Sequence, residues 1–131
     1  MQKLDILYIL CSYRALIFKL HFTIQFMFID IHCHIDMYKE IVKIVERANK
    51  KRVGIIVNNG INTEKNRETL RLAEKFPEIK PALGLYPIDA LKMSDKEIEK
   101  EIEFIEKNKG RIFSVGEVGI DLKESDNLER Q

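Results

Sequence analysis

The sequence predicts an α/β fold whose parallel sheet is built from alternating strands and helices. Four short apolar segments of strand length occur at residues 28–34, 53–57, 79–85 and 112–116. Between them, apolar residues recur at helical spacing. Strands that alternate with helices of ten or more residues are typical of βαβ units, in which the strands run parallel. We therefore expect four strand–helix units, the last of them unfinished at Gln131.

The first predicted strand is short and buried, and it ends in two histidines, His32 and His34. Alternate side chains of a strand point to opposite faces, so these two imidazoles share a face and Cys33 points away from it. Two imidazoles at a strand end can bind one divalent cation. The pair alone is equally compatible with one polar and one packed histidine and no metal.

The next elements follow from periodicity and capping. Asp36 is placed to cap a helix over residues 37–50, whose apolar positions recur at helical spacing. The continuous apolar run at 53–57 suits a strand that is covered on both faces. A second helix is expected over residues 63–76.

The second half of the chain repeats this order. Ser94 and Glu97 have the spacing of a capping box and predict the start of a helix. The fourth strand ends just before Glu117, and Asp126 can cap a further helix beginning near residue 127.

Three residues that can bind a metal fall at predicted carboxyl ends of strands: His32, His34 and Glu117. In parallel α/β folds, functional residues gather beyond these ends. The three side chains are therefore predicted to lie on one rim of the sheet, although they are far apart in sequence.

Composition limits the function classes. The 131 residues are 45% hydrophobic and 33% charged, with a net charge of +1, which fits one globular domain and gives no global preference for nucleic acid. Cys11 and Cys33 form no C-x-x-C motif and no disulfide framework. A reducing, cytoplasmic location is the expectation.

Residues 1–26 are apolar but are interrupted by Arg14, Lys19 and His21. These side chains argue against a membrane helix and a secretory signal. We expect residues 1–26 to be an N-terminal extension, with Met27 as the natural start of a domain over residues 27–131. An interfacial or hairpin-forming arm is the alternative.

Three elements in this order carry a resemblance to a known family. Residues 28–36 (FIDIHCHID) resemble the opening F-[IV]-D-[ST]-H-x-H-[LI]-D of the TatD-type metal-dependent hydrolases. Residues 84–90 (GLYPIDA) are similar to the family's G-[LI]-H-P-x-x-A element, and residues 116–121 (GEVGID) to its G-E-x-G-L-D element. The resemblance spans residues 27–131. The last element argues against another phosphoesterase or amidohydrolase that opens with H-x-H.

The resemblance implies the first four strand–helix units of a (β/α)₈ TIM barrel, with a metal centre on its carboxyl-end rim. It implies that His32 and His34 bind one divalent metal and that Glu117 is a catalytic carboxylate that bridges two metals. Asp121 would lie nearby without binding metal. The complete site would hold two ions, of zinc, magnesium or manganese, and cleave phosphodiester bonds of DNA or other ester bonds.

The sequence also departs from the family pattern. Tyr86 replaces a histidine, and we expect it to contact substrate by stacking or hydrogen bonding. A (β/α)₈ barrel needs about 250 residues, and no histidine follows His34. We therefore expect the chain to be truncated and inactive alone, completed by a second-half polypeptide or by self-association. A non-catalytic remnant or interaction module is the alternative.

Overall fold

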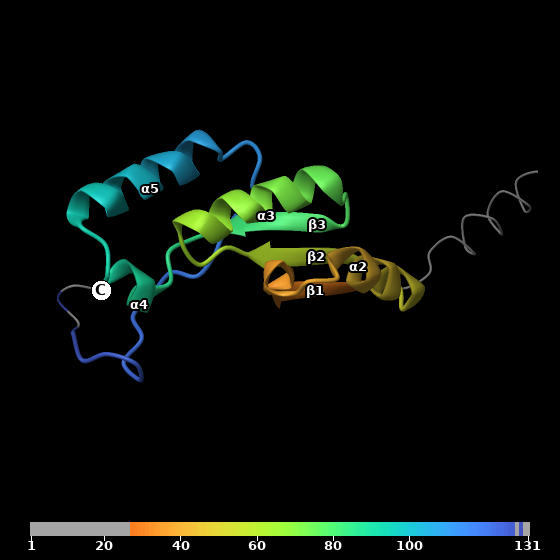
Figure 1. Ribbon diagram of the computed structural model, residues 1–131, viewed down its shortest axis with the longest axis horizontal. Helices are drawn as coiled ribbons and strands as arrows, with labels where there is room; N and C mark the ends of the chain where they lie inside the picture. Colours follow the sequence, from red (N-terminus) through yellow and green to blue (C-terminus); the bar gives the residue numbers. More distant parts are fainter. Residues whose placement is uncertain (1–26, 128, 130–131) are drawn as a thin grey trace, which may run out of the picture.

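The computed structural model describes residues 27–127 and 129, which contain a four-stranded parallel sheet with helices over one face (Figure 1). The strand order is β1-β2-β3-β4, so every crossover joins neighbouring strands. The sheet is the first half of a barrel. In chain order the elements are β1 (Phe28–Cys33), the 3-10 turn η1 (Ile35–Met37), α2 (Ile41–Lys50), β2 (Val53–Asn59), α3 (Thr63–Lys75), β3 (Ile79–Leu83), α4 (Pro87–Ala90), α5 (Asp95–Lys107) and β4 (Ser114–Val115).

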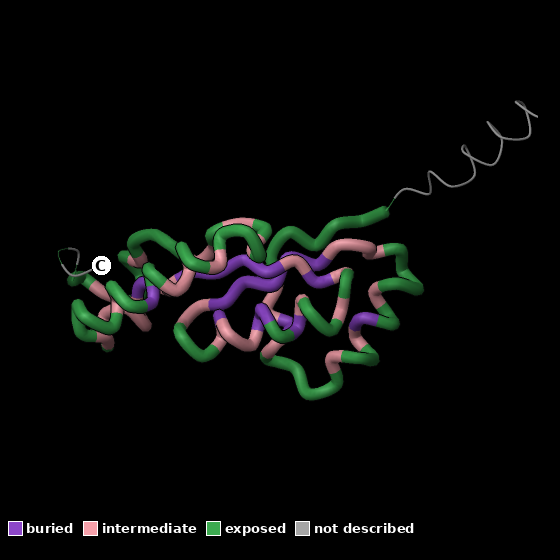
Figure 2. Tube along the Cα trace, turned by 90° about the horizontal axis from the view of Figure 1, so that it is seen from above, coloured by how far each residue is buried: buried purple, intermediate pink, exposed green. Residues whose placement is uncertain are grey.

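The hydrophobic core lies between the sheet and the helices α2 and α3. Its buried members come from the first turn, both helices and the two central strands: Ile35, Val45, Ile56, Leu72 and Ile79. Buried positions follow β2 and β3, whereas β1, which was predicted to be buried, is exposed along most of its length because it is an edge strand of the described sheet (Figure 2). The central strands are therefore the most buried part of the sheet, but the described helices cover one face only, so the prediction that residues 53–57 are covered on both faces is not met.

Two polar networks are buried beside this core. In the first, the Asn66 side chain accepts a hydrogen bond from Gly84 N (3.1 Å) and donates to Gly84 O (2.9 Å) and Glu101 Oε1 (2.8 Å). Glu101 is 2% exposed and accepts two contacts of 2.6 Å from Arg67. This network ties α3 and α5 to the end of β3.

The second network surrounds Asn58 at the end of β2. Its amide donates to Asp36 Oδ1 (3.0 Å) and Thr69 Oγ1 (2.7 Å), and its oxygen accepts from Ile35 N (2.6 Å). Lys65 Nζ lies 3.1 Å from Asp36 Oδ2. The network thereby fixes the segment that follows β1 against β2 and α3.

The predicted start of the first helix was wrong. Asp36 lies in η1, and α2 begins four residues later than expected, after Glu40, with no side-chain cap. The physical reason is that the Asp36 carboxylate is buried against Asn58 and Lys65, so it is not available as a cap.

Other boundaries differ less. α3 and the capping box of α5 are confirmed. β2 extends to Asn59, whereas β3 stops at Leu83 and β4 contains two residues only. The short helix α4 was not predicted, although Pro87 at its first turn is a recognised start signal. The expected extension at residues 1–26 lies outside the described residues, as does most of the helix expected from residue 127.

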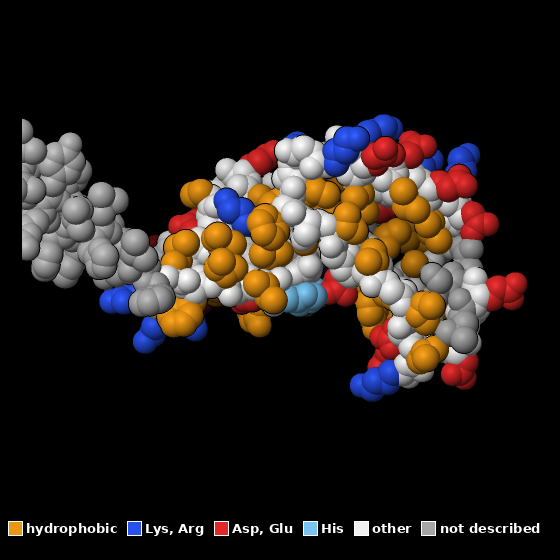
Figure 3. Space-filling view, turned by 180° about the vertical axis from the view of Figure 1, so that it is seen from behind, with side chains coloured by type: hydrophobic (Ala, Val, Ile, Leu, Met, Phe, Trp, Pro, Cys, Tyr) orange, Lys and Arg blue, Asp and Glu red, His pale blue; other side chains and the backbone are white. Residues whose placement is uncertain are grey.

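The uncovered face and edges of the sheet are apolar (Figure 3). Phe28, Ile31 and Val115 of the edge strands are all more than half exposed. Unpaired, apolar sheet edges favour association with another chain or segment. No helix among the described residues has the length and apolarity needed to cross a membrane.

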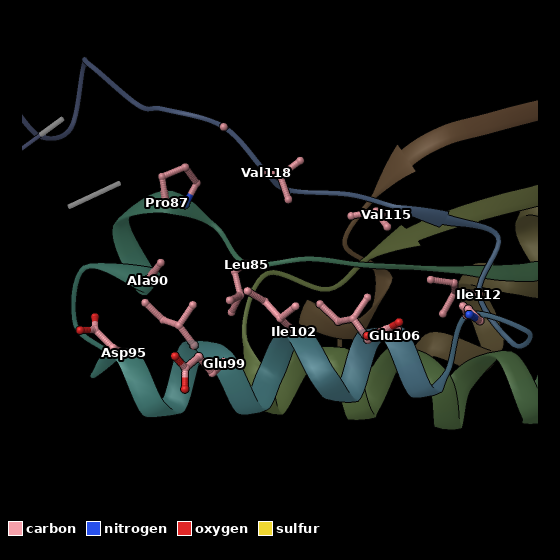
Figure 4. Close-up of a pocket in the computed structure, with 14 residues that line it drawn as sticks. Leu85, Pro87, Ala90, Asp95, Glu99, Ile102, Glu106, Ile112, Val115 and Val118 are labelled. Atoms are coloured by element: carbon pink, nitrogen blue, oxygen red, sulfur yellow. The ribbon is translucent and has the colours of Figure 1, made fainter. Parts of the chain in front are cut away.

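An apolar groove runs between α5 and the segment that contains β4 (Figure 4). Ile102 of α5 faces Val115 and Val118 across it, and both Ile102 and Val118 are exposed. None of its lining residues belongs to the His32, His34 and Glu117 group. Functional residues of parallel α/β folds gather at the carboxyl ends of the strands, so this groove beside α5 is separate from the rim where chemistry is expected.

The buried carboxylate of Glu101 gives a test of the fold. Arg67→Ala removes the cation beside a nearly buried anion and should lower the free energy of unfolding by about 3 kcal/mol. Arg71→Ala, on the same helix, removes only an exposed pair with Glu68 and should cost less than about 1 kcal/mol. Urea denaturation measures both, and equal losses would contradict this role of Glu101.

Candidate metal centre

Three side chains converge at the carboxyl-end rim. His32 Nε2 lies 2.9 Å and His34 Nε2 lies 3.7 Å from Glu117 Oε1. One nitrogen or oxygen atom from each residue lies within 4.8 Å of the others. The histidines come from the end of β1 and the carboxylate from the segment after β4, so the sheet brings together residues 85 positions apart.

The strand geometry of the histidines is as predicted. The two rings lie 5.1 Å apart between centroids and are nearly perpendicular, whereas Cys33 between them packs against the hydrophobic core. The His32 side chain is 56% exposed, His34 28% and Glu117 17%. The group is therefore open to solvent on the His32 side.

A backbone carbonyl orients His34. Its Nδ1 lies 2.8 Å from the carbonyl oxygen of Asn59, at the end of β2. A carbonyl only accepts, so Nδ1 carries a hydrogen, and Nε2 is the nitrogen that faces Glu117 and is available to bind a metal. Histidines that bind metals commonly make such a bond through their other nitrogen, which fixes the tautomer.

Glu117 has an unusual backbone conformation. Its φ is +50°, in the left-handed region that costs a non-glycine residue about 1–2 kcal/mol. The residue before it is held by a 2.9 Å hydrogen bond from Gly116 N to Leu83 O. A Cβ on Gly84 would lie 1.3 Å from the Gly116 oxygen, so β3 and the Gly116 turn approach as closely as two glycines permit. This turn directs the carboxylate back toward β1.

The donor set fits a divalent cation. Ligands about 2.0–2.2 Å from a shared ion in tetrahedral geometry stand roughly 3.4 Å apart, close to the 2.9 and 3.7 Å separations here. Two imidazole nitrogens with one carboxylate suit zinc and manganese, and a carboxylate also suits magnesium. His32, His34 and Glu117 are thus able to hold one ion together.

The two other predicted site residues pair with each other. Tyr86 Oη donates a 2.6 Å hydrogen bond to Asp121 Oδ2. This bond, with smaller effects of burial and nearby carboxylates including Glu117, raises the pKa of Tyr86 to about 12. The same bond holds the pKa of Asp121 below its usual range. The structure therefore joins these residues beside the three-residue group, not within it.

Sequence reasoning missed the residues that support the site. Asn59 supplies the carbonyl for His34, and the Oδ1 of its side chain lies 2.4 Å from where a Cβ on Gly116 would stand. Asn58 and Asn66 fix the ends of β2 and β3 from the helix side. The available signal was the pair of asparagines directly after a buried strand, since buried amides need specific partners.

Comparison with known proteins places this geometry in a class. The parallel α/β arrangement is shared with a solved structure of a TatD homologue. A sequence model of the family described as TatD related DNase matches residues 29–131, and the chain belongs to that family.

Individual relatives agree with this assignment. The chain is 36% identical over 107 residues to the metal-dependent hydrolase MJ1582 of Methanocaldococcus jannaschii. It is 34% identical over 108 residues to the metal-dependent hydrolase YjjV of Escherichia coli. A third relative, 27% identical over 104 residues, is the human deoxyribonuclease TATDN3. The solved structure of the E. coli TatD homologue YjjV superimposes with a TM-score of 0.61 over 72% of this chain.

The chain spans about two fifths of the length of the relatives it matches. The matches cover 79%, 79% and 72% of this chain but 41%, 42% and 38% of the three relatives. The solved structure is covered over 38% of its length. The predicted family and fold class are therefore confirmed, and the metal-binding, catalytic and substrate-binding roles of individual residues stay predictions.

The packing of Cys33 gives a second test. Burial, supported by the negative charges of Asp30 and Asp36 and opposed by a hydrogen bond to the Ile35 backbone, raises the pKa of Cys33 to about 11. Because only the thiolate reacts readily, alkylation of Cys33 at pH 8 should be at least about tenfold slower in the folded chain than in urea. Mass spectrometry of the peptide that contains Cys33 measures both rates, and equal rates would contradict its packing.

Proposed function

We propose that this chain forms the metal-binding half of a TatD-type hydrolase that cleaves phosphodiester bonds of DNA. The observation that carries the proposal is the convergence of His32, His34 and Glu117 on one point of the rim. The membership of the chain in the TatD-related family and its similarity to a deoxyribonuclease support the substrate class.

The residues would act as follows. His34, held by the Asn59 carbonyl, offers Nε2 in a fixed direction, and Glu117 supplies the negative charge that compensates a cation. His32 stands on the open side, from which a substrate phosphate can approach. Bound divalent ions acidify water and stabilise negative charge on the phosphoryl oxygens. Glu117, directed inward by its turn, is the proposed bridge between two such ions.

Further strands are needed to complete this site. The described rim supplies three candidate ligands, and the relatives are more than twice as long as the matched segment. We infer that the chain alone binds one ion and is inactive, and that the remaining strands complete a second ion site. A second-half polypeptide or a second copy of the chain can supply such strands along the exposed edges.

A non-catalytic interaction module is the second candidate. The apolar groove beside α5 and the exposed side chains of β1 and β4 favour it. This function needs no metal, so metal binding distinguishes the two candidates.

Metal binding is tested by one conservative substitution. Glu117→Gln removes the anionic ligand and should weaken binding of Mn²⁺ or Zn²⁺ by about tenfold or more, measured by titration calorimetry. Glu103→Gln, the same change on the exposed side of α5, should leave binding unaltered. A wild-type chain that binds neither ion would overturn the proposed function.

Hydrolysis is tested with the chain alone and with the remaining barrel half supplied separately. We expect metal-dependent cleavage of a fluorescent DNA only when the chain is mixed with the rest of the M. jannaschii relative. His34→Ala should abolish that cleavage. Metal binding without any hydrolysis of a phosphodiester or ester by the mixture would limit the function to binding.

A further inference from the structure

We infer that Tyr86 is a positioning residue: by binding Asp121 it holds the segment that carries Glu117 against the metal centre. The inference rests on the proposed function and assigns Tyr86 a role through another residue, in addition to any contact with substrate. It is carried by the hydrogen bond from Tyr86 Oη to Asp121 Oδ2 at 2.6 Å.

The Tyr86 end of this contact is anchored. Its backbone nitrogen donates to Ile61 O at 2.7 Å, which ties it to the segment after β2. Its carbonyl accepts from Asp89 N (3.0 Å) and Ala90 N (2.9 Å), because Tyr86 begins the helix α4. The hydroxyl group therefore projects from a fixed point at the end of β3.

The Asp121 end belongs to a segment with little packing of its own. Val118 is 69% and Ile120 61% exposed, and Gly119 has a φ of +148°. Two hydrogen bonds join the ends of this segment to the β3 side of the sheet: Gly116 N to Leu83 O, and Tyr86 Oη to Asp121. Glu117 lies between these two attachment points.

The conformation of Glu117 explains why a second attachment matters. Its left-handed backbone is unfavourable by about 1–2 kcal/mol for a residue with a side chain. Strained residues persist only where the surroundings over-determine them. Loss of the Tyr86 contact removes one of the bonds that hold this segment, and we expect the carboxylate of Glu117 to be less firmly held at 2.9 Å from His32.

The two oxygens of Asp121 have separate tasks, which makes the inference testable. Oδ1 accepts from Lys123 N (3.0 Å) and Glu124 N (3.2 Å) and so holds the local turn, whereas Oδ2 accepts from Tyr86. Tyr86→Phe removes the hydroxyl and leaves the Asp121 turn intact.

The experiment compares Tyr86→Phe with Tyr38→Phe, the same change at an exposed tyrosine before α2. Tyr86→Phe should weaken binding of Mn²⁺ by the full chain about tenfold, as loss of support for a metal ligand does. It should also alter the visible spectrum of bound Co²⁺, while the urea midpoint stays unchanged. Tyr38→Phe should change neither metal readout.

A double-mutant cycle adds a second arm. If Tyr86 and Asp121 act as a pair, the losses of Mn²⁺ affinity caused by Asp121→Asn and Tyr86→Phe should not add. The double variant should then bind Mn²⁺ no more weakly than the weaker-binding single variant. Additive losses would overturn the inference. Should Tyr86→Phe not fold, the Co²⁺ spectrum of Asp121→Asn decides in the same way.

These experiments distinguish failure of the proposed function from failure of the positioning role of Tyr86. Absence of metal binding by the wild-type chain defeats the proposed function and this inference together. Wild-type binding that Tyr86→Phe leaves unchanged in affinity and spectrum defeats the positioning role alone.

Discussion

The close approach of Gly84 and Gly116 is the constraint on which the candidate site depends. A Cβ on Gly84 would lie 1.3 Å from the Gly116 oxygen, so a glycine at position 84 lets the end of β3 and the turn after β4 come close enough for Gly116 N to bond Leu83 O. The turn then enters the left-handed region at Glu117 and sends the carboxylate across the rim toward the histidines of β1. A side chain on Gly84 would push the two strand ends apart, whereas a side chain on Gly116 would collide with the side chain of Asn59. The separation of Glu117 from His32, and with it the ability to share an ion, follows from this backbone contact.

The two buried polar networks on the helix side of the sheet also fix the strand ends that carry the candidate site. Burying amides and a carboxylate is costly unless every partner is satisfied. Here the satisfied groups lie where strands end: Asn58 fixes the segment after β1, and Asn66 fixes both backbone groups of Gly84. Glu101 and Arg67 then connect that strand end to α5. Apolar packing can hold helices against a sheet at many registers, whereas these directional bonds fix one. Hydrogen bonds on the helix side of the sheet thus fix the positions of the strand ends. The candidate ligand atoms lie at these strand ends, so their positions are fixed as well.

Features of the fold and the candidate site that depend on neighbouring residues in the sequence could be predicted, whereas those that depend on particular side-chain contacts between distant residues could not. The strands, α3 and the capping box at Ser94 follow from local periodicity and were predicted. The grouping of His32 and Glu117 was also predictable, since parallel strands place their carboxyl ends on one rim. The prediction that Asp36 caps a helix was wrong because it considered only the residues next to it in sequence. The actual partner of Asp36, Asn58, is 22 residues away. The roles of Asn58 and of the Tyr86 contact with Asp121 depend on tertiary neighbours. No pattern within a short window of sequence contains them.

The half barrel also explains how a site can be well ordered next to open edges. The candidate group of His32, His34 and Glu117 lies at β1 and β4, the edge strands of the sheet within the described residues, but its support comes through β2 and β3, which are largely buried. His34 is oriented by the carbonyl of Asn59 on β2, and Glu117 by the end of β3. The contacts that position the candidate group of His32, His34 and Glu117 are therefore internal to these four strands and the segments between them. Strands added at either edge would therefore not need to change the contacts that orient His34 and Glu117.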